Sequence, residues 1–169
     1  MNDITVKISI IDPVAYANRG CKVPQYHSEG ASGLDLYACI KDPIRLDWGD
    51  RVLISTGIKL EIPPGYEGQV RSRSGAAVNG IVVANAPGTI DSDYRGEIRV
   101  LITNIARTEF QDETATGGWI LPGTRLAQLV IAPVAHANLV IDNNLTPTVR
   151  GESGFGSTGG MGLDGASGA

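Results

Sequence analysis

The sequence predicts an all-β domain, a distorted jelly-roll barrel or sandwich, from three observations. Up to about Thr148 the apolar residues recur mostly at every second position, as in strands that bury one face. These segments are short, and residues that favour turns separate them. Gly75 to Asn79 is the one helix candidate, and it is too short to change the fold class. Many short strands at this spacing are typical of sandwiches and jelly rolls.

Six segments carry the alternation most clearly: Ile4 to Ile10, Leu34 to Ile40, Val52 to Ile62, Tyr66 to Arg73, Ile98 to Asn104 and Arg125 to Ala132. Groups rich in Gly, Pro and Asp lie between them: Asp47 to Asp50, Pro63 to Gly65, Asp91 to Gly96 and Leu121 to Thr124. The chain has 169 residues, which is long enough for one domain with a substantial core. We therefore expect one β domain over residues 1–148.

The last part of the chain has a different composition. Eight of the 22 glycines occur in the last nineteen positions, among few residues that could anchor a core. We expect residues 149–169 to form a flexible Gly-rich arm. Composition alone favours a terminal linker. A fixed cation, Arg150, and a lone aromatic, Phe155, would instead suit a flap that closes on a charged ligand with a ring.

Charge and cysteine content exclude several classes of protein. The formal net charge of −4 argues against broad electrostatic binding of nucleic acid. Cys21 and Cys39 form no CxxC pair, so neither a disulfide framework nor a zinc site is indicated. Met1 to Ile11 alternates in polarity, unlike a secretory signal, and no apolar run approaches the length of a membrane span. We expect a cytoplasmic protein with no nucleic-acid or membrane partner.

Several segments could carry chemistry, although each also has an ordinary structural explanation. Asn85 to Gly96 has the pattern of a hairpin, whose unpaired backbone groups could bind the edge of a base. Asp35 alternates with Leu34 and Leu36, as a solvated residue on the wet side of a strand does. Gln128 lies inside an apolar strand, where a buried amide needs hydrogen-bond partners.

Five segments, taken in order, resemble the motifs of the trimeric dUTPase family: Ala31 to Leu36, Arg73 to Gly75, Asn85 to Gly96, Arg125 to Gln128, and Arg150 to Gly159. They extend over most of the chain, and their joint occurrence is specific. The resemblance implies a jelly roll in a homotrimer whose active sites are each assembled from three subunits. It also implies hydrolysis of dUTP to dUMP and pyrophosphate with Mg²⁺.

The resemblance assigns a role to each matching residue. The pocket for uracil and deoxyribose would comprise Asn85, Gly88, Thr89, Ile90 and Tyr94, with the Tyr94 ring excluding a ribose 2′-hydroxyl. Asp91 matches the catalytic carboxylate that orients and deprotonates the attacking water.

The other segments of the resemblance concern the triphosphate. Arg73, Ser74 and Gly75 would contact the phosphates, and Ser74 would stabilise the leaving pyrophosphate. Gln128 would lie at the phosphates or at a magnesium-bound water, and Asp35 would support that network. In the arm, Phe155 would stack on uracil, and the γ-phosphate would be held by Arg150, Ser157 and Thr158. Gly156 would also bind the substrate.

No carboxylate cluster in the sequence is sufficient to cage Mg²⁺, so we expect the ion to arrive with the nucleotide, held by phosphate oxygens and waters and not by direct protein ligands. His27 and His136 are expected to be structural.

Two segments depart from the family pattern. Ala76 to Gly80 is shorter than the usual stretch after this motif, and Thr108 to Gly118 is expected to be an inserted surface loop. Three alternatives fit the sequence less well. A dCTP deaminase would carry a glutamate where Leu101 stands, and a zinc deaminase would need HxE and PCxxC motifs that the chain lacks. A trimeric nucleotide-binding module without catalysis would not need Asp91.

Overall fold

The computed structural model describes residues 4–106 and 118–154. The chain divides into two units, residues 1–135 and 136–169. In the first unit the elements are β1 Lys7–Ile10, α1 Pro13–Asn18, β2 Leu34–Tyr37, β3 Ile44–Arg45, β4 Arg51–Glu61, β5 Tyr66–Ser72, α2 Ser74–Val78, β6 Ile81–Val83, β7 Gly88–Ile90, β8 Glu97–Asn104, β9 Trp119–Ile120 and β10 Arg125–Pro133. The described part of the second unit, residues 136–154, contains neither a strand nor a helix.

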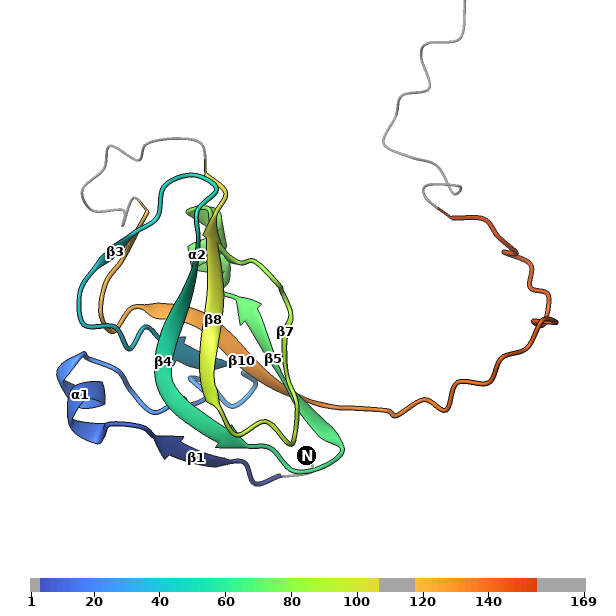
Figure 1. Cartoon of the computed structure of the whole chain (residues 1–169), viewed down its shortest axis with the longest axis horizontal. Helices are drawn as coiled ribbons and strands as arrows, with labels where there is room; N and C mark the ends of the chain where they lie inside the picture. The colour runs from blue at the N-terminus through green and yellow to red at the C-terminus, as the bar shows by residue number, and fades with distance from the viewer. Residues whose placement is uncertain (1–3, 107–117, 155–169) are drawn as a thin grey trace, which may run out of the picture. The chain divides into compact units, whose positions relative to one another are not determined.

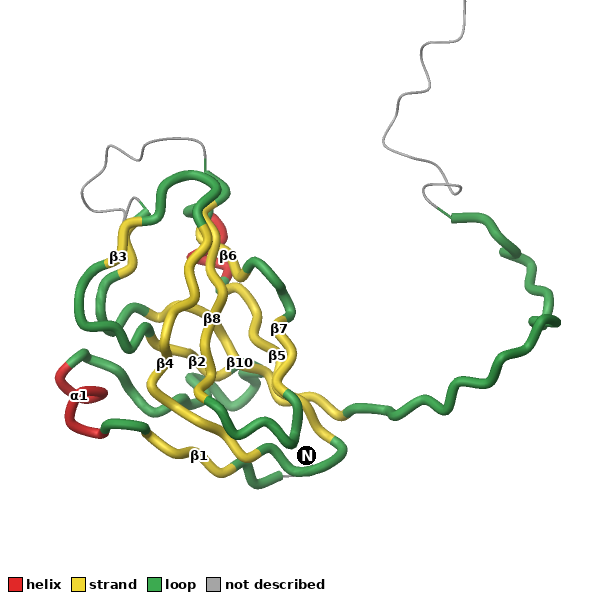
Figure 2. The backbone as a smooth tube through the Cα atoms, in the orientation of Figure 1, coloured by secondary structure: helices red, strands yellow, loops and turns green. Residues whose placement is uncertain are grey.

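Two four-stranded antiparallel sheets form the first unit (Figure 1, Figure 2). One has the order β1-β4-β8-β6, the other the order β2-β10-β5-β7, and β3 pairs with β9 in a small separate ladder. The connections alternate between the sheets, since β4 and β5 are consecutive strands but belong to different ones. The predicted all-β class is confirmed, and the longer predicted segments coincide with β1, β2, β4, β5, β8 and β10.

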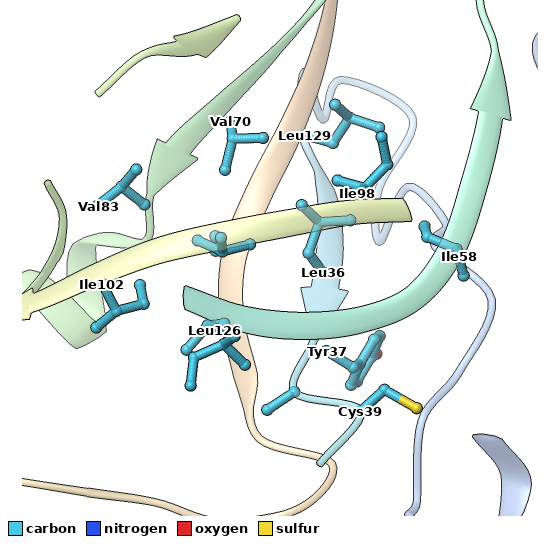
Figure 3. Close-up of a cluster of buried hydrophobic side chains, with 14 of the residues drawn as sticks. Leu36, Tyr37, Cys39, Ile58, Val70, Val83, Ile98, Ile102, Leu126 and Leu129 are labelled. Atoms are coloured by element: carbon cyan, nitrogen blue, oxygen red, sulfur yellow. The ribbon is translucent and has the colours of Figure 1, made fainter. Parts of the chain in front are cut away.

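The core lies between the two sheets. Ile54 and Ile58 of β4 and Ile102 of β8 face Leu36 of β2 and Leu129 of β10, and each is almost completely buried. Figure 3 shows such side chains between the ribbons of both sheets. Each stabilises the fold by about 1.5 to 3 kcal/mol relative to an exposed position. The alternation in the sequence therefore has its expected physical basis.

Both cysteines belong to this core as free thiols. Burial, helped by the neighbouring Cys39 thiol, raises the pKa of Cys21 to about 12. A thiol with such a pKa stays protonated at neutral pH and is a poor nucleophile. Cys21 and Cys39 thus act as small apolar side chains.

The helix α1 was not predicted, although its start carries a recognisable signal. The Asp12 carboxylate accepts a hydrogen bond from the Ala15 amide at 2.9 Å, and Pro13 occupies the first helical turn. Tyr16 is buried, and its hydroxyl donates to the Lys22 carbonyl at 2.6 Å. Tyr16 is the one buried residue of this six-residue helix. Neither α1 nor α2, the two helices among the described residues, is long and apolar enough to cross a membrane.

The segment Asn85 to Gly96 is not the simple hairpin that the sequence predicted. The strands that flank it, β6 and β8, are indeed antiparallel neighbours. However, Gly88–Ile90 forms β7 and pairs with β5 of the other sheet, so that Gly88 lies opposite Val70. Gly88 and Ile90 are buried, which favours the position of β7 against the second sheet. The segment therefore bridges the two sheets.

The pairing of β4 with β8 contains an irregularity. Ser55 pairs with Arg99, but the next aligned pair is Lys59 with Glu97, so four positions along β4 correspond to two along β8. Gly57 lies in this bulge with φ of +68°, where a residue with a side chain is strained. A Cβ atom at Gly57 would also lie 2.7 Å from Cys39 Sγ.

We expect Gly57→Ala to destabilise the protein more than Gly49→Ala. Both glycines have positive φ, but a Cβ atom at Gly49 would meet nothing within 4 Å. Backbone strain alone costs about 1 to 2 kcal/mol, and overpacking against Cys39 adds about 1 kcal/mol or more. Urea unfolding of both variants measures the difference. Equal losses of stability in the two variants would show that the side chains around Gly57 can move to accommodate the added methyl group.

Candidate functional site

An open groove of about 600 Å³ lies where β7, β8 and β4 come together, lined by Leu53, Thr89, Ile90, Asp91, Tyr94, Gly96, Glu97, Ile98 and Arg99. Thr89 and Ile90 come from β7, and the turn after β7 supplies Asp91 and Tyr94. Of the residues that the sequence assigned to the base and sugar, the groove thus contains Thr89, Ile90 and Tyr94 together with Asp91.

Asp91 begins a tight turn. The Tyr94 amide donates to the Asp91 carbonyl at 3.1 Å, and Arg95 Nη1 donates to the Ser92 and Tyr94 carbonyls at 2.6 and 2.9 Å. The Asp91 side chain is exposed, and no described residue hydrogen-bonds to its carboxylate. The backbone of the turn is held while its carboxylate lines the groove, an arrangement suited to orienting a water molecule.

Asn85 and Gly88 lie beside the groove and do not line it. Gly88 is buried, and a Cβ atom there would lie 3.2 Å from Asn85 Nδ2 and 3.4 Å from Val70 Cβ. A glycine suits this close approach of backbone and side chain. Asn85 is exposed, and its amide packs over the start of β7.

Glu97 lines the same groove, and sequence reasoning did not single it out. Its Oε1 atom accepts hydrogen bonds from the Ser55 hydroxyl and, at 2.9 Å, from the Gly57 amide, and its Oε2 atom lies 3.1 Å from Arg99 Nε. Burial alone would raise the pKa of Glu97, but the donors Ser55, Gly57 and Arg99 outweigh it and lower the pKa below its usual value. Glu97 is therefore ionised at neutral pH. Its bulge partners come from tertiary structure, so no local pattern indicates them.

Asp35 is the centre of a cluster of charged side chains away from the groove-lining set. Its carboxylate is 9% exposed and lies 2.8 Å from Arg73 Nε, 3.1 Å from His27 Nε2 and 3.5 Å from Arg125 Nη1. The interpretation of Asp35 as a solvated residue is wrong. Asp35 lies opposite Gln128 of β10, whose other neighbour in the sheet is β5. Arg125 begins β10 and Arg73 follows β5, so both arginines reach Asp35 from these neighbouring strands. His27 has a structural contact here.

Gln128 has a structural role within the same region. Its Nε2 atom donates to the Ser72 carbonyl at 3.0 Å, and a Cβ atom at Gly33 would lie 2.6 Å from Gln128 Oε1. In the sheet Gln128 lies opposite Asp35 on β2 and Arg71 on β5. The amide is half-buried and has the partner that the sequence argument required.

Arg73, Ser74 and Gly75 mark the change from β5 to α2. Arg73 occupies the N-cap position with extended backbone, and its guanidinium turns back to Asp35. Ser74 and Gly75 are exposed at the first turn of the helix. None of the three lines the groove around Asp91, so the single chain holds two separate groups of predicted site residues.

The arm is described only as far as Gly154. There, the Gly151 amide donates to the Thr148 carbonyl at 3.1 Å, and Arg150 Nε donates to the Ser153 carbonyl at 2.9 Å, which makes a local turn. Phe155, Gly156, Ser157 and Thr158 lie outside the described residues, as does the predicted inserted loop except for Gly118. The expected roles of these residues stay predictions.

The part of the chain that the structure describes contains no group of three or more His, Cys, Asp or Glu side chains that could hold a metal ion. Asp35 already contacts Arg73, Arg125 and His27 and is unsuited to bind a further cation. Asp91 is an exposed carboxylate in the groove. The Asp91 carboxylate is suited to accept hydrogen bonds from the waters of a Mg²⁺ ion that a ligand's phosphates carry.

Comparison with known sequences identifies the family. The model of the dUTPase family matches residues 19–159. The chain belongs to the dUTPase family. It is 49% identical over 144 residues to a deoxyuridine 5′-triphosphate nucleotidohydrolase of Chlamydia caviae, a match that covers 83% of the chain and 92% of the relative. It is 51% identical over 140 residues to the protein of that name from Methylocella silvestris, covering 81% and 82%.

Solved structures of dUTPases share the fold. The dUTPase of Staphylococcus bacteriophage 80alpha, solved with dUPNHPP, has a TM-score of 0.76 at 26% identity and covers 92% of this chain and 98% of its own. A point mutant of the dUTPase from a Staphylococcus aureus phage, whose structure concerns a structural Mg(II) ion, has a TM-score of 0.68 at 24% identity and covers 84% and 99%. The prediction of a dUTPase-like fold is confirmed.

We expect Asp35→Asn to lower the free energy of unfolding by about 2 kcal/mol. The substitution leaves Arg73, whose side chain is only 27% exposed, without its charged partner. Asp47→Asn is the matched control, because the Arg45–Asp47 pair has a similar distance of 2.9 Å but is exposed on both sides. Chemical denaturation compares the two, and an equal small loss in both would contradict a stabilising role for the Asp35 cluster.

We expect the stability contributed by the Glu97 carboxylate to depend on pH. Because folding lowers the pKa of Glu97, its contribution is present above the unfolded value of about 4.3 and is lost as pH falls through the folded value. The stability difference between wild type and Glu97→Gln should therefore narrow as pH falls from about 7 to about 3. Denaturant unfolding over this range measures it. A difference that stays constant would mean that the charge of Glu97 is not what stabilises the bulge.

Proposed function

We propose that this protein hydrolyses dUTP to dUMP and pyrophosphate through a water molecule that Asp91 positions and deprotonates. Membership of the dUTPase family and the name of its curated relatives support the overall reaction. One observation carries the mechanism: a carboxylate with no described hydrogen-bond partner lies in the same groove as a tyrosine ring, on a turn whose backbone is held by hydrogen bonds.

In the proposed reaction the water oxygen attacks the α-phosphorus in line with the bridging oxygen that leaves. Asp91 accepts the proton of the water as the new phosphorus–oxygen bond forms. The bond from the α-phosphorus to the bridging oxygen breaks, and the electron pair leaves with pyrophosphate. Ser74, at the first turn of α2, stabilises that leaving group by donating a hydrogen bond.

The proposed recognition of the nucleoside uses the residues of the groove and those beside it. The backbone of Thr89 and Ile90 can pair with the edge of uracil, with Asn85 beside it. Gly88 lets the chain approach closely because a side chain there would meet Asn85 and Val70. The Tyr94 ring packs against the deoxyribose, and a ribose 2′-hydroxyl would collide with the ring.

The phosphate-binding part of the proposed site lies in the second group of residues. The described groove contains only one cation, Arg99, whereas Arg73 and Arg125 lie together at the ends of β5 and β10. Because the two groups do not line one groove in the single chain, we propose that neighbouring copies complete each active site in a homotrimer, as the family resemblance implies. The arm residues Arg150, Phe155, Gly156, Ser157 and Thr158 would close over the nucleotide from a further subunit.

Mg²⁺ would enter this site with the triphosphate and would be held by phosphate oxygens and water. When bound it neutralises charge that develops on the leaving pyrophosphate. Residues of the chain act around it. Asp35 orients Arg73. Gln128 lies at the phosphates or at a magnesium-bound water, and Gly75 permits close approach of the backbone. We place the enzyme in the cytoplasm, where its nucleotide substrate is available.

Deamination of a cytosine nucleotide is the alternative reaction of a related kind. It needs a carboxyl group that moves protons at the base. Leu101, where that family has a glutamate, lies outside the groove, in a hollow lined also by Ala84 and Thr103. Glu97 is in the groove, but its oxygens already accept three hydrogen bonds and its pKa is lowered, which makes it a poor proton donor at neutral pH. The geometry thus favours hydrolysis at phosphorus.

A panel of dUTP, UTP, dTTP and dCTP with Mg²⁺ and product identification tests the proposal. We expect dUMP and pyrophosphate from dUTP, and little turnover of the others. Asp91→Asn should bind dUTP as the wild type does but hydrolyse it about 10³-fold more slowly, because the amide cannot accept the proton. Asp93→Asn, an exposed position two residues further on that does not line the groove, is the control.

Formation of a deaminated product from dCTP would contradict the proposal and indicate a deaminase. Binding of dUTP without any product would indicate a nucleotide-binding module that lacks catalysis. Unchanged turnover in Asp91→Asn would remove this residue from the chemistry.

A further inference from the structure

Tyr94, the residue proposed to select the sugar, is held in place by Gly96 and Glu97. Its hydroxyl donates to the backbone carbonyl of Glu97 at 3.0 Å. Its ring folds over Gly96, where a Cβ atom would lie 2.9 Å from Tyr94 Cε2 and closer still to Cζ and Oη. The position of the ring therefore depends on where the backbone of residues 96 and 97 lies.

The backbone at residue 97 is held by the Glu97 side chain. Its Oε1 atom accepts from the Ser55 hydroxyl and the Gly57 amide, so the carboxylate takes the place of a ladder partner at the bulge, where regular pairing of β4 with β8 is interrupted. Thr56 adds a hydrogen bond from its hydroxyl to the Ile98 carbonyl at 2.5 Å. Without the carboxylate, the Gly57 amide and the Ser55 hydroxyl would lose their acceptor.

The bulge is in turn tied to the rest of the first unit. The Ile11 amide donates to the Gly57 carbonyl at 3.0 Å, and the Cys39 amide donates to the Ser55 carbonyl at 2.8 Å. Glu97 thus connects the Tyr94 ring to a part of the backbone that cannot shift independently. A ring held in this way can exclude one additional oxygen atom, whereas a ring free to move cannot.

We infer that Glu97 is a positioning residue for sugar selection: its carboxylate locks the start of β8 to the bulge in β4 and so holds the carbonyl that fixes the Tyr94 hydroxyl. The inference rests on the proposed function, in which Tyr94 excludes the 2′-hydroxyl. Glu97 itself touches neither the sugar nor the reacting phosphorus in this scheme. The Glu97 carboxylate already accepts three hydrogen bonds from the protein, so it is not free to bind the substrate.

The test compares kcat/KM for dUTP and UTP in the full-length protein with Mg²⁺, at a temperature where every variant is folded by circular dichroism. We expect Glu97→Ala to lower the ratio of the two values by about tenfold, mainly through faster turnover of UTP. Ser55 does not line the groove, and Ser55→Ala removes one of the donors to the Glu97 carboxylate. This variant should lower the ratio of kcat/KM values less than Glu97→Ala does. Glu61→Gln is the matched control, since Glu61 lies on β4, the strand of Ser55, in an exposed pair with Lys7.

A double-mutant cycle separates positioning from general loosening. Tyr94→Phe removes the hydroxyl that Glu97 fixes, so adding Glu97→Ala to it should change the selectivity ratio little further. Independent, additive effects would contradict the inference. An equal fall of kcat for both nucleotides in Glu97→Ala with an unchanged ratio would also overturn it, because it would indicate a direct catalytic part or a purely structural one.

A second measurement does not depend on turnover. The ring resonances of ¹³C-labelled Tyr94, identified by their loss in Tyr94→Phe, should shift or broaden in Glu97→Ala and Ser55→Ala and stay unchanged in Glu61→Gln. Unaltered resonances in Glu97→Ala would overturn the inference even if the wild type failed to hydrolyse dUTP. That failure would count against the proposed function alone.

Discussion

The antiparallel pairing of β4 with β8 changes register by two residues between Ser55 and Lys59, and the candidate site depends on that change. A regular ladder would leave no amide at Gly57 for a side chain to satisfy. The bulge leaves one, and the Glu97 carboxylate accepts its hydrogen bond. The same residue begins β8, receives the Tyr94 hydroxyl on its carbonyl and lines the groove. The need of the Gly57 amide for an acceptor thus determines the position of the Tyr94 ring.

Three carboxylates in the two groups of site residues have three different environments, and these suit three different roles. Asp91 is exposed, and no described residue bonds to its carboxylate, so it can hold water. Glu97 accepts three hydrogen bonds and is kept ionised. Asp35 is buried among two arginines and a histidine and orients them. The residue type is nearly the same in each case, so the difference in role comes from burial and from the donors that surround each group.

The two groups of site residues lie at different places in the first unit. The groove is formed where β7 pairs with one sheet and β8 enters the other, whereas the Asp35 cluster is formed where β2, β5 and β10 lie side by side. Each group is anchored by strands whose other face belongs to the core. Relatives at about half identity over most of the chain support the reaction, and the separation of the two groups is the physical reason for proposing that copies of the chain share their sites.

The fold class and the family could be predicted without any coordinates. Period-two alternation follows from burying one face of each strand, and it is evident in β4, β8 and β10 from the sequence. The motif around Asp91 is likewise local, because a turn and its flanking residues are contiguous. The start of α1 also carried a local signal in Asp12 and Pro13, although that helix was not predicted.

The partners of Asp35, the pairing of β7 with the other sheet and the part played by Glu97 became evident in the folded chain alone. Asp35 and Arg73 are 38 positions apart, and Ser55 and Glu97 are 42 apart. Contacts at such separations depend on how whole strands are registered, and a one-residue shift would exchange the buried and exposed faces. Local patterns therefore identify which residues carry chemistry, whereas strand register determines which of them meet.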